Sequence, residues 1–408
     1  METEPVAQKI QPINPEAQPT QPLRHDAKPT RPLPKWLIPG VAAVVAVIAL
    51  AISIGSGGKK SAPPPSAKAP TVQTAAEPAP TKAVPAVPME VHTMAATEYV
   101  FSNNDVPATP FWGQQQYMRK DVKTLTFQSS LQNAPGSAWD VSEAGDRSVL
   151  AWMDNGDLYV AADGAIAPNS NASCLFQEFV NLKTIDFGNC FDTSSVTDMS
   201  SMFNYCTSLT SLDLSGFDTS NVTDMGWMFN YCASLTSLDL SGFDTSSVTD
   251  MSLMFQNCAS LTSLDVSSFD TSNVTHMIFM FNLCESLTSL DLSGFDTSSV
   301  TGMSVMFQNC ASLTSLDLSG FDTSNVTKMA GMFSNCKDLT SLDLSGFDTS
   351  NVADMSNMFR SCTSLTNLNL SSFDASAVTK MDSMFYGCDN LPDIICSDSK
   401  ILKEFRNR

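Results

Sequence analysis

Apolar residues recur at fixed positions every 26 residues through the second half of the chain. In one unit, Leu209, Leu212 and Leu214 alternate with polar residues, which predicts a short strand whose leucines face inward. A short helix is predicted next, because apolar residues then return every three or four positions, at Val222, Met225, Met228, Phe229 and Cys232. One unit cannot bury both faces alone, so the period predicts a solenoid of stacked units.

The period extends over residues 174–396 and predicts an α/β fold, a leucine-rich-repeat solenoid. Short parallel strands are expected on the concave side and short helices on the convex side. Phe217 and its equivalents predict a stacked core ladder, Asp218 an Asx turn and Asn221 a helix N-cap. The pair Met-Phe marks each unit, at 202, 228, 254, 280, 306, 332, 358 and 384.

Eight cysteines share the period, from Cys206 to Cys388. Side chains stacked in register point the same way, which suits the ~90° torsion of a disulfide poorly, so buried reduced thiols are predicted. Cys174 and Cys190 lie off this ladder, and a disulfide between them stays open as an alternative. No cluster of cysteine and histidine has the spacing of a zinc site.

The N-terminal part of the chain changes character several times. Residues 1–35 are polar and rich in proline, which predicts disorder. Trp36–Ile54 is apolar and uncharged, and as a helix it spans roughly 28 Å, which predicts a membrane anchor. The basic residues before it place the N-terminus in the cytoplasm and the rest of the chain outside; a cleaved signal peptide is the alternative. Residues 55–89, rich in Ala and Pro, predict an extended linker.

Residues 90–173 have the composition of a small β-rich unit. Val122–Phe127 predicts a strand, and the runs on either side of Asn155-Gly156 predict a β-hairpin. A solenoid needs its first turn covered, so this unit is the predicted N-terminal cap. Residues 397–408 form a basic C-terminal tail.

The repeat CTSLTSLDLSGFDTSNVTDM with its following Met-Phe, together with the preceding stretch at 138–168, resembles the BspA-family leucine-rich-repeat surface proteins of bacteria. The resemblance implies display on the cell surface and adhesion to host proteins or to other cells. It supplies no catalytic residues. No wall-sorting motif of the wall-anchored relatives stands near the C-terminus, which leaves the N-terminal apolar segment as the predicted anchor.

The charge of the chain narrows its function further. The formal net charge is -20 and the pI is about 4.3, so the sequence offers no basic surface for nucleic acid. The repeated carboxylates have the same neighbours in every unit, so nothing separates two pKa values as an acid–base enzyme requires. We therefore expect a protein that is not an enzyme and that needs no cofactor.

An outward column of aspartates follows the predicted strands. Carboxylates stacked at ~5 Å repel one another, and water, serine hydroxyls or bound calcium would relieve the repulsion. A solvated acidic face, calcium binding and contact with a basic partner all stay open. The residues of this concave acidic column are Asp213, Asp239, Asp265, Asp291, Asp317 and Asp343.

The repeat varies most at one outward position of the predicted helix. Four consecutive units carry large apolar residues there, and an exposed stripe of this kind is typical of a protein-binding surface. Contact with the cap or the linker, and drift without function, are the alternatives. The candidate residues of this convex stripe are Trp227, Leu253, Phe279 and Val305, with Tyr231 and His276 nearby.

Together these patterns predict a single-pass membrane protein with its repeats outside the cell. Its expected function is adhesion, through binding of host or neighbouring-cell proteins by the solenoid. The alternative function is a structural scaffold that self-associates laterally through the convex stripe.

Overall fold

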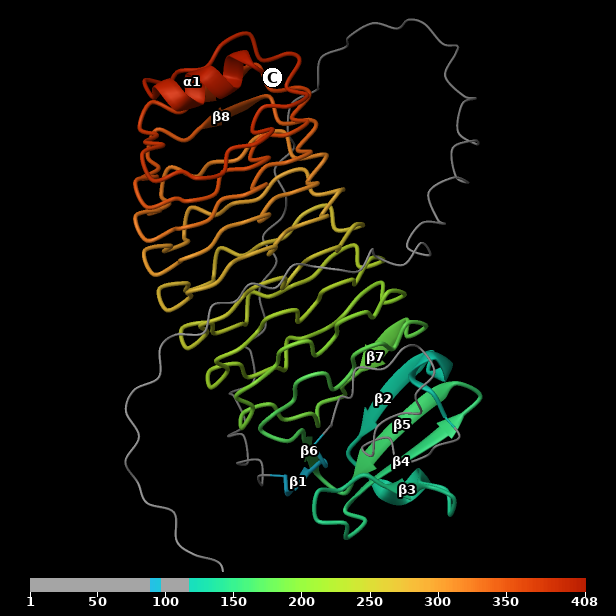
Figure 1. The fold of residues 1–408 in the computed structure, drawn as a ribbon. Helices are drawn as coiled ribbons and strands as arrows, with labels where there is room; N and C mark the ends of the chain where they lie inside the picture. Colours follow the sequence, from blue (N-terminus) through green and yellow to red (C-terminus); the bar gives the residue numbers. More distant parts are fainter. Residues whose placement is uncertain (1–88, 97–116) are drawn as a thin grey trace, which may run out of the picture. The chain divides into compact units, whose positions relative to one another are not determined.

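The computed structural model describes residues 89–96 and 117–408 of the chain (Figure 1). The predictions for residues 1–35, for Trp36–Ile54 and for almost all of the linker fall outside this description. Among the described residues, no helix has the length and apolar character needed to cross a membrane. The described residues belong to one compact unit, Ala83–Arg408.

A five-stranded sheet with the order β3-β4-β5-β2-β7 precedes the stacked repeats. The β4–β5 pair is the hairpin predicted around Asn155, and positive φ values of 52° at Asn155 and 99° at Gly156 form its tight turn. The strand predicted at Val122–Phe127 is also confirmed, as β2. The strands are β2 (Thr124–Gln128), β3 (Trp139–Asp140), β4 (Val149–Asp154), β5 (Asp157–Ala162) and β7 (Thr184–Asp186).

Main-chain bonds join this sheet to the first repeat. β2 lies between β5 and β7 and runs parallel to both, so the strand of the first repeat belongs to the same sheet. A second parallel pair, β1 (Val91–Thr93) and β6 (Ala165–Ala167), continues through a bridge from Ile166 to Phe191. The sheet therefore covers the first coil, as a cap would. Two short 3-10 helices, η2 (Arg119–Asp121) and η3 (Leu131–Asn133), flank β2.

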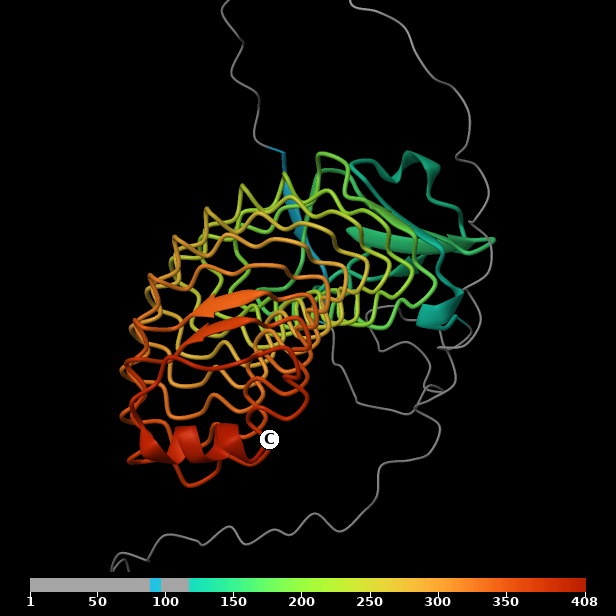
Figure 2. The same cartoon turned by 90° about the horizontal axis from the view of Figure 1, so that it is seen from above.

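Each repeat forms one coil that lies on the next (Figures 1 and 2). Parallel bridges join equivalent residues of successive coils, from the pair Asp198–Asp224 to the pair Asp354–Lys380. Of the coils described, three form the predicted strand in full, as β7, β8 (Ser341–Asp343) and β9 (Asn367–Asn369). We call residues 209–214 and their equivalents the leucine segment of each coil. In the remaining coils these segments lie alongside one another with fewer main-chain hydrogen bonds.

The helices predicted within the repeats are wrong, and the structure has turns in their place. In this turn segment, residues 199–206 and their equivalents, alternate N–H groups donate to the next coil, as from Trp227 to Ser252 O at 2.9 Å. The other N–H groups close turns within the coil, as from Asn230 to Trp227 O at 3.0 Å. This routing replaces the i→i−4 bonds of a helix. Asn221 therefore caps no helix, and its Nδ2 donates to a carbonyl of the preceding coil.

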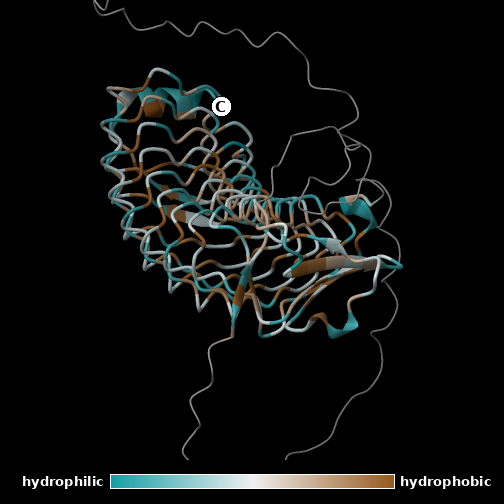
Figure 3. Cartoon of the chain, turned by 90° about the horizontal axis from the view of Figure 1, so that it is seen from below, coloured by the Kyte–Doolittle hydropathy of each residue, from teal (hydrophilic) through white to brown (hydrophobic). Residues whose placement is uncertain are grey.

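The interior of each coil lies between the leucine segment and the turn segment (Figure 3). Leu212 and Leu214 are buried while Asp213 between them is exposed, which confirms the predicted alternation. Phenylalanines stack from coil to coil, as in the pair Phe203–Phe229, whose ring centroids are 5.6 Å apart and whose planes differ by 3°. Packing between coils is therefore enough to explain why these apolar residues repeat, and no functional role is needed for them.

All eleven cysteines are free thiols, so the predicted reduced ladder is confirmed and the alternative disulfide between Cys174 and Cys190 is not formed. Each ladder thiol donates to a main-chain carbonyl, as Cys232 Sγ does to Phe203 O at 3.3 Å. Burial raises the pKa of Cys206 to about 12. The ladder thiols therefore pack in the core and are not reactive groups.

A helix covers the last coil. α1 (Ser399–Arg406) begins at Asp398, whose side chain accepts the N–H groups of Lys400 and Ile401. Ile401 and Phe405 are buried against the coil, and the Phe405 ring meets Phe385 edge-on at 5.3 Å. The basic tail thus closes the end of the core that stacking leaves open.

Candidate protein-binding face

Two columns of the turn segment have positive φ, between 56° and 64° at every residue other than glycine. We call the surface around these columns the turn face. The first turn column consists of Ser201, Trp227, Leu253, Phe279, Val305, Gly331, Asn357 and Ser383. The second turn column consists of Tyr205, Tyr231, Asn257, Leu283, Asn309, Asn335, Ser361 and Gly387.

The large residues of the first turn column stand on strained backbone. A residue with a Cβ atom loses about 1–2 kcal/mol in the left-handed region, and Gly, Asn and Asp are the usual occupants. Val305, at φ 64°, is β-branched and is the least suited of the column. Gly331 and Asn357 hold the same position with less strain. The repeat therefore does not need a large side chain here.

These side chains are only partly buried, so burial offsets only part of this free energy. Trp227 is 41% exposed and Tyr205 39%. Leu253, Phe279 and Val305 are half-buried. Tyr231 is also half-buried and stacks on Tyr205, with centroids 4.4 Å apart and planes 6° from parallel. The structure thus gathers the stripe predicted from the sequence on one face, in consecutive coils, although the face is made of turns and not of helix.

A charged column runs beside the stripe, along the bridges that join the coils. We call it the bridge column: Asp198, Asp224, Asp250, His276, Gly302, Lys328, Asp354 and Lys380. Its first three members are acidic, and burial raises the pKa of Asp224, with Asp198 and Asp250 adding repulsion. Basic residues enter only after His276, and Lys380 lies 3.6 Å from Asp354. The bridge column is therefore acidic at one end and mixed, with two lysines, at the other.

A hollow of about 290 Å³ opens in the turn face at the C-terminal end of the stripe. It exists because Gly331 and its neighbours Ala330 and Ser334 have little or no side chain. Val305 bounds the hollow on one side and Arg360 on the other. The Arg360 guanidinium lies over the Tyr386 ring, 5.1 Å from its centroid.

The predicted acidic column has a structural role in every coil. One oxygen of each carboxylate accepts the N–H of the serine two residues later, as Asp213 Oδ1 does from Ser215 at 3.0 Å. This bond lowers the pKa of Asp213 in spite of the stacking. The described residues contain no group of three His, Cys, Asp or Glu side chains that could hold a metal ion. The same bond is made by Asp239, Asp265, Asp291, Asp317 and Asp343.

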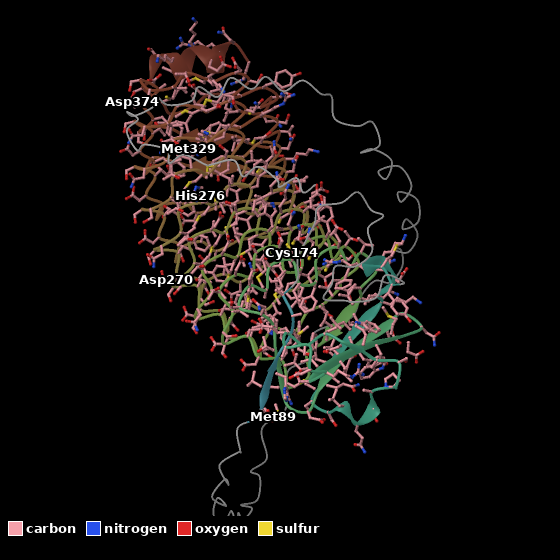
Figure 4. The ribbon with its side chains drawn as sticks, turned by 60° about the horizontal axis from the view of Figure 1, so that its bottom comes forward. Met89, Cys174, Asp270, His276, Met329 and Asp374 are labelled. Carbon is pink, nitrogen blue, oxygen red and sulfur yellow. The ribbon has the colours of Figure 1, made fainter. Side chains whose placement is uncertain are left out.

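A second aspartate column, at Asp218 and its equivalents, forms the predicted Asx turns. Asp218 Oδ1 accepts the N–H of Ser220 at 3.0 Å. Asp270 and Asp374 of this column lie along one edge of the array, away from His276 (Figure 4). The aspartates that the repeat keeps constant therefore shape turns, while His276 lies exposed in the bridge column.

Sequence reasoning missed the hollow and the charges that accompany the stripe. The sequence does not mark Gly331 or Arg360 as part of a hollow, because each is consistent with ordinary variation at its position in the repeat. A signal was present: Asn257, Asn309 and Asn335 fall in one column, and asparagine at a repeated position is typical of left-handed backbone.

Comparison with known proteins identifies the repeats. A family model described as "Mycoplasma protein of unknown function, DUF285" matches residues 170–290, 237–342 and 277–397. A solved complex of TLR13 with ssRNA13 is similar at 17% identity and a TM-score of 0.24, over 56% of this chain and 35% of that one. A leucine-rich cell surface protein from Faecalibacterium prausnitzii A2-165 is similar at 17% identity and a TM-score of 0.20, over 69% of this chain and 89% of that one. No curated protein matches the chain.

Proposed function

The chain belongs to the family described as "Mycoplasma protein of unknown function, DUF285", and we propose that its repeats form a leucine-rich-repeat solenoid that binds protein through the turn face. The observation that carries the proposal is the strained, half-exposed row in the first turn column. Folding does not require large side chains at these positions, since the same column elsewhere holds Ser, Gly and Asn. The left-handed backbone is common to every coil, but the fold does not require a large side chain on it, and strain of this kind is typical of functional surfaces. The row is Trp227, Leu253, Phe279 and Val305.

The size of the effect supports recognition over drift. At about 1–2 kcal/mol for each residue, the strain of the four residues amounts to several kcal/mol before their partial burial is subtracted. That is a large part of the net stability of an ordinary domain. A partner that buries an exposed tryptophan and phenylalanine returns more than this, because aromatic anchors dominate protein interfaces.

The place proposed for this binding is the outside of the cell. Trp36–Ile54 would hold the chain in the membrane, and the linker that follows would carry the repeats outward. The turn face would then bind host proteins or proteins of a neighbouring cell. The uncharged apolar segment, the Pro-rich composition after it and the resemblance to BspA-family proteins support this placement.

The proposed binding is non-covalent and involves no catalysis. The support is the uniformity of the two constant aspartate columns: each carboxylate there accepts the N–H of the serine two residues later, so no pair within these columns is set apart for proton transfer.

The experiment compares the full chain with Trp227→Asn plus Phe279→Asn. Beads carrying either protein are washed over surfaces coated with extracellular-matrix proteins or with the chain itself. Retention of the wild type and its loss in the variant are expected, while the melting temperature does not fall because asparagine relieves the strain. Ser201→Asn and Ser383→Asn are the matched controls, since they place the same residue in the same column outside the row.

Two results would overturn the proposal. One is a wild type that neither surface retains. The other is a variant that is retained as well as the wild type while it remains folded.

A further inference from the structure

We infer that the partner of the turn face is a second copy of this chain, which packs antiparallel across a two-fold axis at Phe279. This inference rests on the proposed function and specifies its partner. A two-fold interface requires a surface that complements itself, so that each feature on one side of the axis meets its counterpart from the other side. The turn face meets this requirement in shape and in charge.

The shape complement is a projecting side chain and a hollow. Trp227, the most exposed member of the first turn column, stands two repeats before Phe279. Gly331, at the centre of the hollow, stands two repeats after it. An antiparallel copy therefore places each Trp227 over the Gly331 of its partner. The hollow, at about 290 Å³, has room for an indole, and Arg360 at its rim presents a cation to the ring.

The charges follow the same axis. In the bridge column, Asp224 stands two repeats before His276 and Lys328 stands two repeats after it. The antiparallel arrangement thus sets the carboxylate of Asp224 opposite the ammonium group of Lys328, twice. Asp198 meets Asp354, whose charge Lys380 already offsets at 3.6 Å. Opposed charges of this kind set the register of an interface.

The centre of the interface is apolar. Leu253 and Val305 stand one repeat before and one repeat after Phe279, so each meets the other across the axis. Phe279 meets its own copy. Toward the ends, small residues such as Ser201 and Asn357 face one another and offer no obstacle. The apolar stripe is thus centred on the axis that the hollow and the charges define.

Other arrangements of two copies fit less well. A parallel pair in register sets Trp227 on Trp227 and Asp224 on Asp224, which leaves the hollow unfilled and opposes like charges. End-to-end growth is blocked, because α1 covers the last coil and the β2–β7 sheet joins the first.

The first test uses complementary variants of the full chain in sedimentation equilibrium. Trp227→Ser removes the projecting side chain and keeps the hollow, whereas Gly331→Leu fills the hollow and keeps the projecting side chain. Leu253 shows that the fold accepts leucine at a similar φ, with the strain common to the row, and the space around Gly331 admits a Cβ atom. Each variant alone loses both insertions, and its dimer is expected to weaken by roughly 30-fold or more per insertion. A one-to-one mixture regains one insertion, so heterodimers are expected to be at least roughly 30-fold tighter than either homodimer.

The second test exchanges charges and keeps the shape. In the Lys328→Asp homodimer, each Asp224 faces a carboxylate in place of an ammonium group. In the Asp224→Lys homodimer, each Lys328 faces an ammonium group in place of a carboxylate. A mixture of the two variants restores both opposite pairs, so heterodimers are expected at wild-type affinity, with a strong dependence on salt. Circular dichroism confirms that each variant is folded.

The outcomes separate this inference from the proposed function. Rescue in both mixtures supports the antiparallel dimer. A monomeric wild type, or mixtures no tighter than the single variants, overturns it. If the chain is monomeric but beads still lose retention on matrix proteins after Trp227→Asn plus Phe279→Asn, the partner is a different protein and the proposed function stands. If neither measurement changes, both fail.

Discussion

Val305 offers a direct measurement of the strain in the first turn column. It combines a β-branched side chain with φ of 64°, and its N–H donates to Ala330 O at 2.9 Å. Val305→Asn leaves this bond in place and puts a residue that tolerates left-handed backbone at the site. The relief is about 1–2 kcal/mol. Removing the partly buried valine costs about 1 kcal/mol of apolar burial, taken as roughly two thirds of the ~1.5 kcal/mol for full burial.

The expected result is a variant that is at least as stable as the wild type and up to about 1 kcal/mol more stable. Urea denaturation of the full chain followed by far-ultraviolet circular dichroism measures the difference, and hydrogen exchange of the Val305 amide locates it in the right coil. Val300→Asn is the matched control, because Val300 of the same coil is fully buried and its replacement is expected to lower the stability by about 3 kcal/mol or more. A Val305→Asn protein less stable than the wild type would refute the argument that the column is strained.

Four further predictions concern the rest of the molecule. The ladder thiols are expected to resist iodoacetamide at pH 8 until the chain unfolds, since burial raises the pKa of Cys284 and of Cys336 to about 12; mass spectrometry counts the modified sites. Phe405→Ala is expected to lower stability by about 3 kcal/mol and to speed hydrogen exchange in the last coils first, because the ring closes the end of the core. Hydrogen bonds from serine lower the pKa of Asp213 and of Asp218 in the folded chain, so their stabilisation is present above the unfolded pKa and is lost as pH falls through the lower folded value; acid melts should therefore show the loss below about pH 4. Millimolar calcium is expected to leave the melting temperature unchanged, because each carboxylate of the Asp213 column already spends an oxygen on a serine N–H, and a rise measured by calorimetry would restore the calcium interpretation.

The sequence predicted the stacking of the repeats because stacking depends on which residues are buried. Leu212, Phe229 and Cys232 had to face inward in any arrangement that repeats every 26 residues, and they do. The hairpin at Asn155-Gly156 could also be predicted from the sequence, because this dipeptide strongly favours a two-residue hairpin turn.

The helix prediction was wrong because the spacing of residues does not show which carbonyl each N–H group donates to. Met225, Met228 and Cys232 are separated by three and four residues, as are residues that share one face of a helix. A succession of turns has the same spacing, and the difference lies in bonds such as Phe203 N–H to Met228 O at 2.9 Å, which join one coil to the next. Such bonds depend on the neighbouring coil, so periodicity within a single unit cannot show them.

The candidate stripe lies on one face of the array for a reason that does not involve the helix. Variation at one position of a constant repeat marks a site that the core leaves free, whether the backbone there is helix or turn. The hollow at Gly331 required the structure, because an absent side chain becomes a cavity only where its neighbours are known.

The bonding between coils and the recognition surface are two consequences of one backbone conformation. Alternate N–H groups can reach the next coil only if the chain turns repeatedly, and those turns set φ positive at two columns of every repeat. Side chains at these columns project from the array, so they can change without disturbing the core. Each large side chain placed there strains its own coil, which limits how many coils can carry one. The division of the first turn column into a large apolar half and a small half is the arrangement expected when a surface must bind strongly over a few coils and remain stable over all of them, and in an antiparallel pair the small half is where the partner's Trp227 is received.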